Sequence, residues 1–119
     1  MKVTKDGNVY KVARITGPKH NFLGLTLSGA EVPSLTVERL QVDDGGVYAG
    51  TLDEQQLIEA VRHGVTEANQ QFGTHFYIAK LQYVVTDTPD PSVYSLLAQK
   101  IVEAAWRDTI HIVSAVSPA

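Results

Sequence analysis

Hydrophobic and polar positions alternate in short runs through the first forty residues, and turn residues separate the runs. Such runs are typical of β-strands, whose successive side chains point to opposite faces of a sheet. Asp6-Gly7-Asn8 and Gly17-Pro18 interrupt the pattern, because glycine tolerates a positive φ and proline lacks a backbone donor. We therefore predict four strands in this part of the chain, over residues 1–5, 9–16, 22–27 and 35–42.

From residue 51 the pattern changes to the 3.6-residue period of an amphipathic helix. Thr51 and Glu54 have the spacing of a capping box, in which each side chain accepts a hydrogen bond from a first-turn backbone amide. Gly73 stands where a helix C-terminal stop is expected. The predicted apolar face, which we expect to pack against the sheet, consists of Leu57, Ile58, Val61, Val65 and Ala68.

Residues 75–86 are too rich in β-branched and aromatic residues to extend that helix, and they predict a long strand. The two faces of this strand are predicted to differ in polarity. One face is entirely apolar, whereas the other is apolar at its ends and polar in its middle, at Lys80 and Gln82. Such a strand indicates a sheet that helices cover on one side only, so the partly polar face is predicted to meet water or a partner. Strict alternation predicts an entirely apolar face of Tyr77, Ala79, Leu81, Tyr83 and Val85.

A second helix is predicted to begin at Asp90-Pro91, where an acidic cap precedes a proline that needs no amide hydrogen. Its apolar positions recur at helical spacing up to Trp106, which we expect to close it. Residues 109–116 are predicted to form a last short strand, because β-branched residues dominate them.

These elements predict an α+β fold in a single domain spanning residues 1–119. We expect a two-layer sandwich in which a mostly antiparallel sheet of about five to six strands carries two helices on one face. The expected order is four strands, helix, strand, helix, strand. In element order alone it resembles the second-domain fold of ribosomal protein S5, but no residue motif of that family is present, so the resemblance carries no function.

Composition narrows the class of protein. An apolar fraction of 44% and a charged fraction of 19% are typical of a globular domain. No apolar run approaches the roughly 20 residues that span a bilayer, and the first residues lack the apolar core of a secretory signal. We therefore expect a cytoplasmic protein without membrane association. The absence of cysteine excludes disulfides and thiolate chemistry.

Candidate chemistry is sparse, and no metal site or cofactor is predicted. No two of His20, His63, His75 and His111 have the i, i+4 spacing of a helical metal site. The sequence also lacks a Gly-x-Ser-x-Gly elbow and a glycine-rich nucleotide loop. The acidic segment 43–46 lacks the later ligands of a calcium loop, so we interpret it as a solvated turn.

Four residues remain as candidate ligand-binding residues: Lys19, His20, Tyr48 and His75. Residues 17–21, which include two of them, have the composition of a loop that can hold an anion, but we favour a plain strand-to-strand connection because the spacing of a phosphate-binding loop is absent. Tyr77 and Tyr83 are expected in the core, because they share the apolar face of the long strand. Tyr10 and Tyr48 are expected to be freer to anchor an interface.

These observations favour a non-enzymatic binding or protein-interaction domain that self-associates through a sheet edge or the partly polar sheet face. A first alternative is a small enzyme or ligand-binding protein with a pocket between helices and sheet. Convergence of two or more of His20, His63, His75, His111, Asp87 and Tyr48 would favour that alternative. A second is an RNA- or ribosome-associated domain, because the first 20 residues hold five basic residues and one acidic residue.

Overall fold

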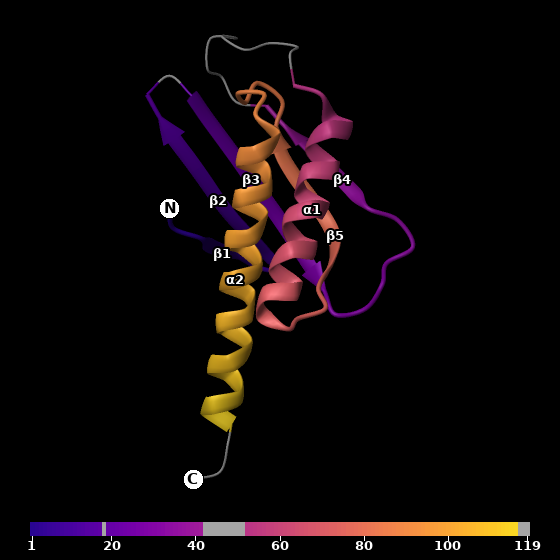
Figure 1. Ribbon diagram of the computed structural model, residues 1–119, viewed down its shortest axis with the longest axis vertical. Coiled ribbons are helices and arrows are strands. Elements are labelled where there is room, and N and C mark those ends of the chain that lie inside the picture. The colour runs from indigo at the N-terminus through magenta and orange to yellow at the C-terminus, as the bar shows by residue number, and fades with distance from the viewer. Residues whose placement is uncertain (18, 42–51, 117–119) are drawn as a thin grey trace.

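A five-stranded sheet with two helices on one face forms the part of the protein that the computed structural model describes (Figure 1). That part comprises residues 1–17, 19–41 and 52–116, with backbone only over 110–116. The predicted α+β two-layer sandwich is confirmed. The elements are β1 (Thr4–Asp6), β2 (Val9–Thr16), β3 (Lys19–Ser28), β4 (Thr36–Leu40), α1 (Glu54–Phe72), β5 (Tyr77–Val84) and α2 (Pro91–Val116).

The strands lie in the order β1-β2-β3-β5-β4, so β5 is inserted between two strands that precede it in the chain. All neighbouring strands are antiparallel except β4 and β5, which are parallel. A parallel pair needs a crossover connection, and α1 lies in that connection. The sheet is therefore mostly antiparallel, as predicted.

The hairpin between β2 and β3 is tighter than we predicted. Gly17 has a φ of +62°, and Thr16 pairs directly with Lys19 across the turn. β3 consequently begins at Lys19 rather than at residue 22. Residues 17–21 thus form the plain strand-to-strand connection that we favoured over an anion-holding loop, with the backbone of residues 19–21 paired with β2.

The N-terminal cap of α1 is Asp53 and not Thr51, which lies outside the described residues. The Asp53 carboxylate accepts from the backbone amides of Gln55 and Gln56, at 3.0 and 3.2 Å. Glu54 accepts hydrogen bonds from Arg39 and from the Tyr83 hydroxyl. At the other end Gly73 has a φ of +68° and stops the helix, as predicted.

A β-bulge in β5 changes which residues face the helices. Thr26 pairs with Lys80 and Leu27 with Ile78, which leaves Ala79 as an extra residue. An extra residue exchanges the two faces of a strand on either side of it. Ile78 is therefore buried in the core, whereas Tyr77 is 43% exposed, so the prediction that Tyr77 lies in the core is wrong.

Helix α2 does not close at Trp106. It continues to Val116, so the strand predicted over residues 109–116 is wrong, and the described chain has one strand fewer than the predicted order. Figure 1 shows this helix extending beyond the end of the sheet. No helix within the described residues is both long and apolar enough to cross a membrane.

The core lies between the sheet and the two helices. Leu57 and Val61 of α1 and Leu97 and Ile101 of α2 are at most 1% exposed. They belong to one cluster with strand residues that include Leu23, Leu25, Leu81 and Tyr83. The predicted packing of both helices on the apolar face of the sheet is thus confirmed.

Candidate functional site

The face of the sheet opposite the helices is uncovered within the described residues (Figure 1). Alternation along the strands gives this open face two kinds of surface. Polar side chains occupy its middle. At the end where β3 begins and β5 ends lies a group of apolar residues that we call the apolar corner: Ala13, Ile15, Phe22 and Val84.

The apolar corner surrounds a hollow of about 440 Å³. Ala13 faces Phe22 across β2 and β3, and Ile15 faces His20, so these pairs share the open face. Ile15 is 75% exposed, more than any other large hydrophobic residue of the described chain. His20 and Asp87 complete the wall of the hollow.

Asp87 ties three elements together behind this hollow. Its Oδ1 lies 3.0 Å from Nδ1 of His20. Its Oδ2 accepts from the backbone amide of Phe22 at 2.6 Å and from the Tyr94 hydroxyl at 2.9 Å. The carboxylate therefore joins the start of β3 to the turn after β5 and to α2.

Burial dominates the electrostatics of this cluster. Asp87 is 1% exposed, and desolvation raises its pKa, although the hydrogen bonds from Phe22, His20 and Tyr94 favour its ionised form. Desolvation likewise raises the pKa of the fully buried Tyr94, and the Asp87 charge raises it further. The carboxylate also fixes the orientation of the His20 ring at the edge of the hollow.

The four candidate ligand-binding residues do not form one site. Lys19 and His20 are neighbours in β3, so alternation directs them to opposite faces. His75 lies before β5, at the end of that strand away from His20. Tyr48 lies outside the described residues, as does the predicted turn over 43–46.

Two of the residues whose convergence would favour the small-enzyme or ligand-binding alternative, His20 and Asp87, do meet in the structure, at the hollow of the apolar corner, so this pair counts in favour of that alternative. His63 is on the surface of α1, 2.9 Å from Glu67. His111 lies in α2, where only the backbone is described. No group of three or more His, Cys, Asp or Glu residues able to hold a metal ion is found in the described chain.

Tyr10 is not the free interface anchor that we expected. It is buried in the core, and its hydroxyl donates to Oδ2 of Asp108 at 2.8 Å. Burial raises the pKa of Tyr10 to about 12, and the hydrogen bond to Asp108 acts in the same direction. This bond attaches β2 to α2.

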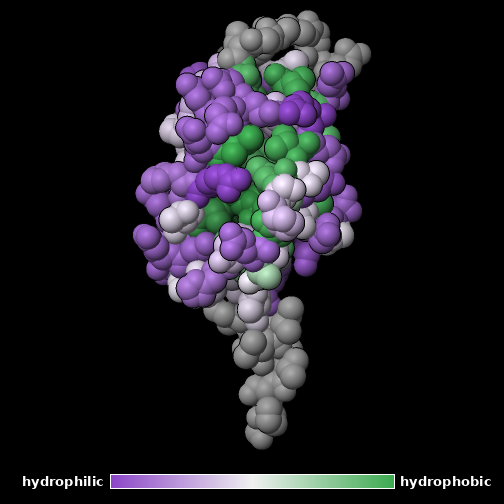
Figure 2. All heavy atoms as spheres, turned by 90° about the vertical axis from the view of Figure 1, so that its right-hand side faces the viewer, coloured by the Kyte–Doolittle hydropathy of each residue, from purple (hydrophilic) through white to green (hydrophobic). Residues whose placement is uncertain are grey.

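A second hollow, of about 320 Å³, lies between α1 and the start of β5. Arg62, Thr66 and His75 contribute polar groups to it, and Val65 and Ile78 contribute apolar ones. Figure 2 views the molecule from the side of α1 and β4, and it shows apolar surface there framed by polar side chains. The sequence had pointed to His75 but not to Arg62, whose exposed position on a helix carries no distinguishing signal.

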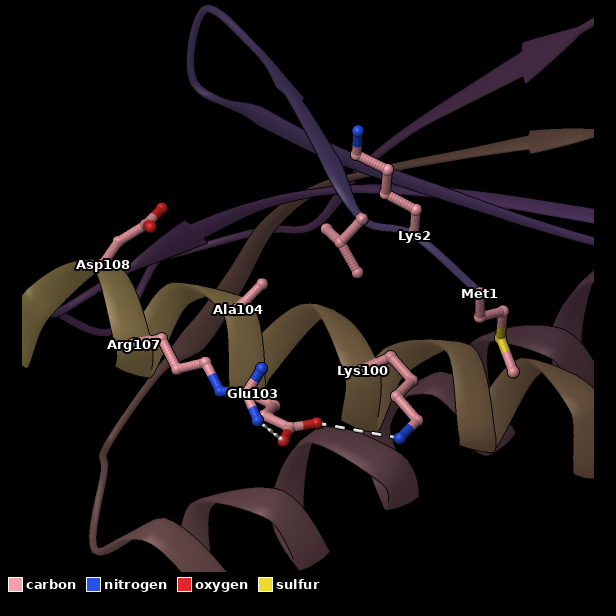
Figure 3. Close-up of a pocket in the computed structure, with 8 residues that line it drawn as sticks. Met1, Lys2, Lys100, Glu103, Ala104, Arg107 and Asp108 are labelled. Atoms are coloured by element: carbon pink, nitrogen blue, oxygen red, sulfur yellow. Dashed lines mark hydrogen bonds and ion pairs between the residues drawn. The ribbon is translucent and has the colours of Figure 1, made fainter.

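A third hollow, of about 440 Å³, separates the N-terminal segment from α2 (Figure 3). Glu103 lies between Lys100 and Arg107 and pairs with both, at 3.8 and 2.8 Å. Asp108, which also lines it, is held by Tyr10. The two cations of α2 at this hollow therefore share one carboxylate within the fold.

Comparison of the chain with protein-family models, with curated proteins and with solved structures found no match. Function is therefore inferred from the geometry of these surfaces.

Proposed function

We propose that this protein is a non-enzymatic binding protein that associates with a second copy of itself through the open face of the sheet. The observation that carries the proposal is the apolar corner, where Ile15 stands 75% exposed beside a hollow of about 440 Å³. Fully burying a side chain of this kind is worth about 1.5–3 kcal/mol. A partner that covers the corner gains that free energy.

The charges on the open face favour a second copy over a strongly charged partner. Asp6 pairs with Lys11 at 3.1 Å, and Glu38 pairs with Lys80 at 2.6 Å. Each pair is neutral, so two copies of this face do not repel one another. A two-fold interface must be self-complementary, and an apolar corner beside a neutral polar surface meets that requirement.

Two polar atoms near the middle of the open face also lack partners. Oε1 of Gln82 and Oγ1 of Thr26 are buried and form no hydrogen bond within the described chain. Buried polar groups without partners are costly. Both atoms are shielded from solvent, so this cost stays within the fold and a molecule docked on the face does not relieve it.

The sheet edges are less suited to association than the face. β1 is only three residues long and includes the charged Lys5 and Asp6. At the other edge, Glu38 and Arg39 of β4 form ion pairs with Lys80 and Glu54. Short strands and charged residues are the usual protection against edge-to-edge pairing.

The RNA-associated alternative has less support from the contacts of its basic residues. Lys11 is paired with Asp6, and the Lys5 ammonium lies over the Tyr10 ring, 5.1 Å from its centre. Basic side chains that already interact with a carboxylate or an aromatic ring of the same protein contribute less positive charge to a surface that binds RNA phosphates.

The test is the mass of the protein in solution as a function of concentration. By sedimentation velocity, we expect the unmodified protein to shift from monomer to dimer as its concentration rises. Ile15→Asp should stay monomeric, because a carboxylate in the centre of the interface is desolvated without a partner. Gln71→Asp adds the same charge to the exposed surface of α1 and should dimerise normally. A monomer at every concentration, or equal dimerisation of both variants, would contradict the proposal.

A further inference from the structure

The hollow between α1 and the start of β5 contains a cationic group without a partner. Arg62 forms no ion pair or hydrogen bond with any other described residue, whereas five other basic residues each pair with a carboxylate: Lys11, Arg39, Lys80, Lys100 and Arg107. Thr66 and Asn69 follow it at i+4 and i+7 and lie on the same stripe of the helix. His75 and the backbone at the start of β5 line the other side of the hollow.

The register of the sheet explains why a hollow exists at this place. β4 begins to pair with β5 at Lys80, so residues 77–79 have no β4 residue beside them. The sheet is therefore one strand narrower beneath this part of α1. The side chains of Val65 and Ile78, both more than nine-tenths buried, form an apolar floor where the missing pairing leaves space.

Asn69 holds the wall of the hollow in place. Its Nδ2 donates to the Phe76 carbonyl at 3.0 Å, and its Oδ1 accepts from the Phe76 amide at 3.1 Å and from the Thr74 hydroxyl at 2.8 Å. These bonds attach the segment before β5 to α1. The segment that carries His75 is therefore held beside α1 before any ligand arrives, which lowers the ordering cost of binding.

We propose that this hollow, with Arg62 and His75 at its rim and Val65 and Ile78 at its floor, binds a small carboxylic acid that carries one apolar ring. The planar guanidinium matches a carboxylate with two parallel hydrogen bonds. The imidazole adds a donor at the rim. The apolar floor takes the ring, and the volume of about 320 Å³ is within the usual range for small-ligand pockets.

This site is separate from the apolar corner, because His75 and His20 lie at opposite ends of β5. The inference therefore does not depend on self-association. If Ile15→Asp failed to change the oligomeric state, the proposed ligand site would be unaffected. If benzoate failed to bind, the proposed self-association would be unaffected.

Benzoate is a direct probe, because it has one carboxylate and one ring. Titration followed by amide chemical shifts should give saturable changes centred on residues 62–69 and 75–78. Benzyl alcohol, which has the ring without the charge, and inorganic phosphate, which has the charge without the ring, should each bind at least tenfold more weakly. Binding of phosphate as tight as that of benzoate would overturn the ring-bearing ligand class, and absence of saturable benzoate shifts would overturn the site.

Arg62→Gln isolates the role of the cation. The side chain is exposed and unpaired, so the variant should fold normally by circular dichroism. Its affinity for benzoate should fall about tenfold, equivalent to about 1.4 kcal/mol. Arg107→Gln makes the same substitution on α2, where the arginine is paired with Glu103, and should bind benzoate as the unmodified protein does. Equal affinity of both variants would show that benzoate binds elsewhere and would refute the proposal.

Discussion

Replacing Asp87 with alanine is expected to destabilise the protein strongly. The change leaves the Phe22 amide and the Tyr94 hydroxyl without their acceptor, and Tyr94 is fully buried. An orphaned buried donor costs about 1–3 kcal/mol, so the two together cost about 2–6 kcal/mol. His20 is partly exposed and can turn toward water, so it adds little. The loss is a large share of the roughly 5–15 kcal/mol that stabilises a typical domain.

Urea unfolding followed by circular dichroism and by Trp106 fluorescence measures this loss. Asp87→Asn should lose less, about 1–2 kcal/mol, because its oxygen still accepts from Phe22 and Tyr94. Asp6→Ala removes a carboxylate from an exposed ion pair with Lys11 and should change the free energy of unfolding by under about 1 kcal/mol. A loss below about 1 kcal/mol for Asp87→Ala would refute the role of Asp87 as a tie between β3 and α2.

The difference in free energy of unfolding between the unmodified protein and Asp87→Asn should change with pH in a direction set by the pKa of Asp87. The folded pKa of Asp87 is raised above the ordinary value of 3.8, so folded Asp87 binds its proton more tightly than unfolded Asp87. The protonation-linked part of its contribution to the free energy of unfolding is therefore fully present below pH 3.8 and is lost as the pH rises through the folded pKa, whereas the hydrogen bonds from Phe22 and Tyr94 remain. The stability difference between the unmodified protein and Asp87→Asn should accordingly shrink from pH 3.8 upward.

Three further changes test other parts of the fold. Gly64→Ala should lower the free energy of unfolding by about 1–2 kcal/mol, despite a helix-propensity gain of about 1 kcal/mol, because the added Cβ overlaps the Ser95 carbonyl oxygen where α1 crosses α2. Arg39 lowers the pKa of Glu54, so Glu54→Gln should lose less stability than the unmodified protein as the pH falls below 4.5 in urea unfolding. Tyr10→Phe should flatten the loss of stability as the pH rises toward 12, because the folded pKa of Tyr10 is raised.

The elements that could be predicted from the sequence are those with local signals. Gly7, Gly73 and Pro91 set a turn, a helix end and a helix start through their own backbone preferences. The amphipathic faces of both helices likewise depend on nearby residues alone. These features needed no knowledge of which strands pair.

The predictions that were wrong concern residues whose conformation depends on strand pairing far away in the sequence or on the element that precedes them. The bulge at Ala79 exists because of the register between β3 and β5, and no alternation pattern within β5 reveals it. Residues 109–116 have strand-forming composition, but they follow a helix, and extending an existing helix avoids the costly nucleation step.

The candidate site was predictable only in part. His20 and Asp87 were both named, but they are 67 residues apart in the chain, and their contact depends on the antiparallel pairing of β3 with β5. The open face was anticipated from the mixed polarity of one side of β5. The hollow at Arg62 was not, because it results from the point at which β4 stops accompanying β5.

The insertion of β5 between β3 and β4 constrains how the chain can fold during synthesis. β3 ends at Ser28 and β4 at Leu40, but the strand that joins them begins only at Tyr77. Until that strand leaves the ribosome, the facing borders of β3 and β4 have no native neighbour, and such borders are prone to pair with other chains. The native sheet can therefore be completed only late in synthesis, after β5 is available to pair with β3 and β4.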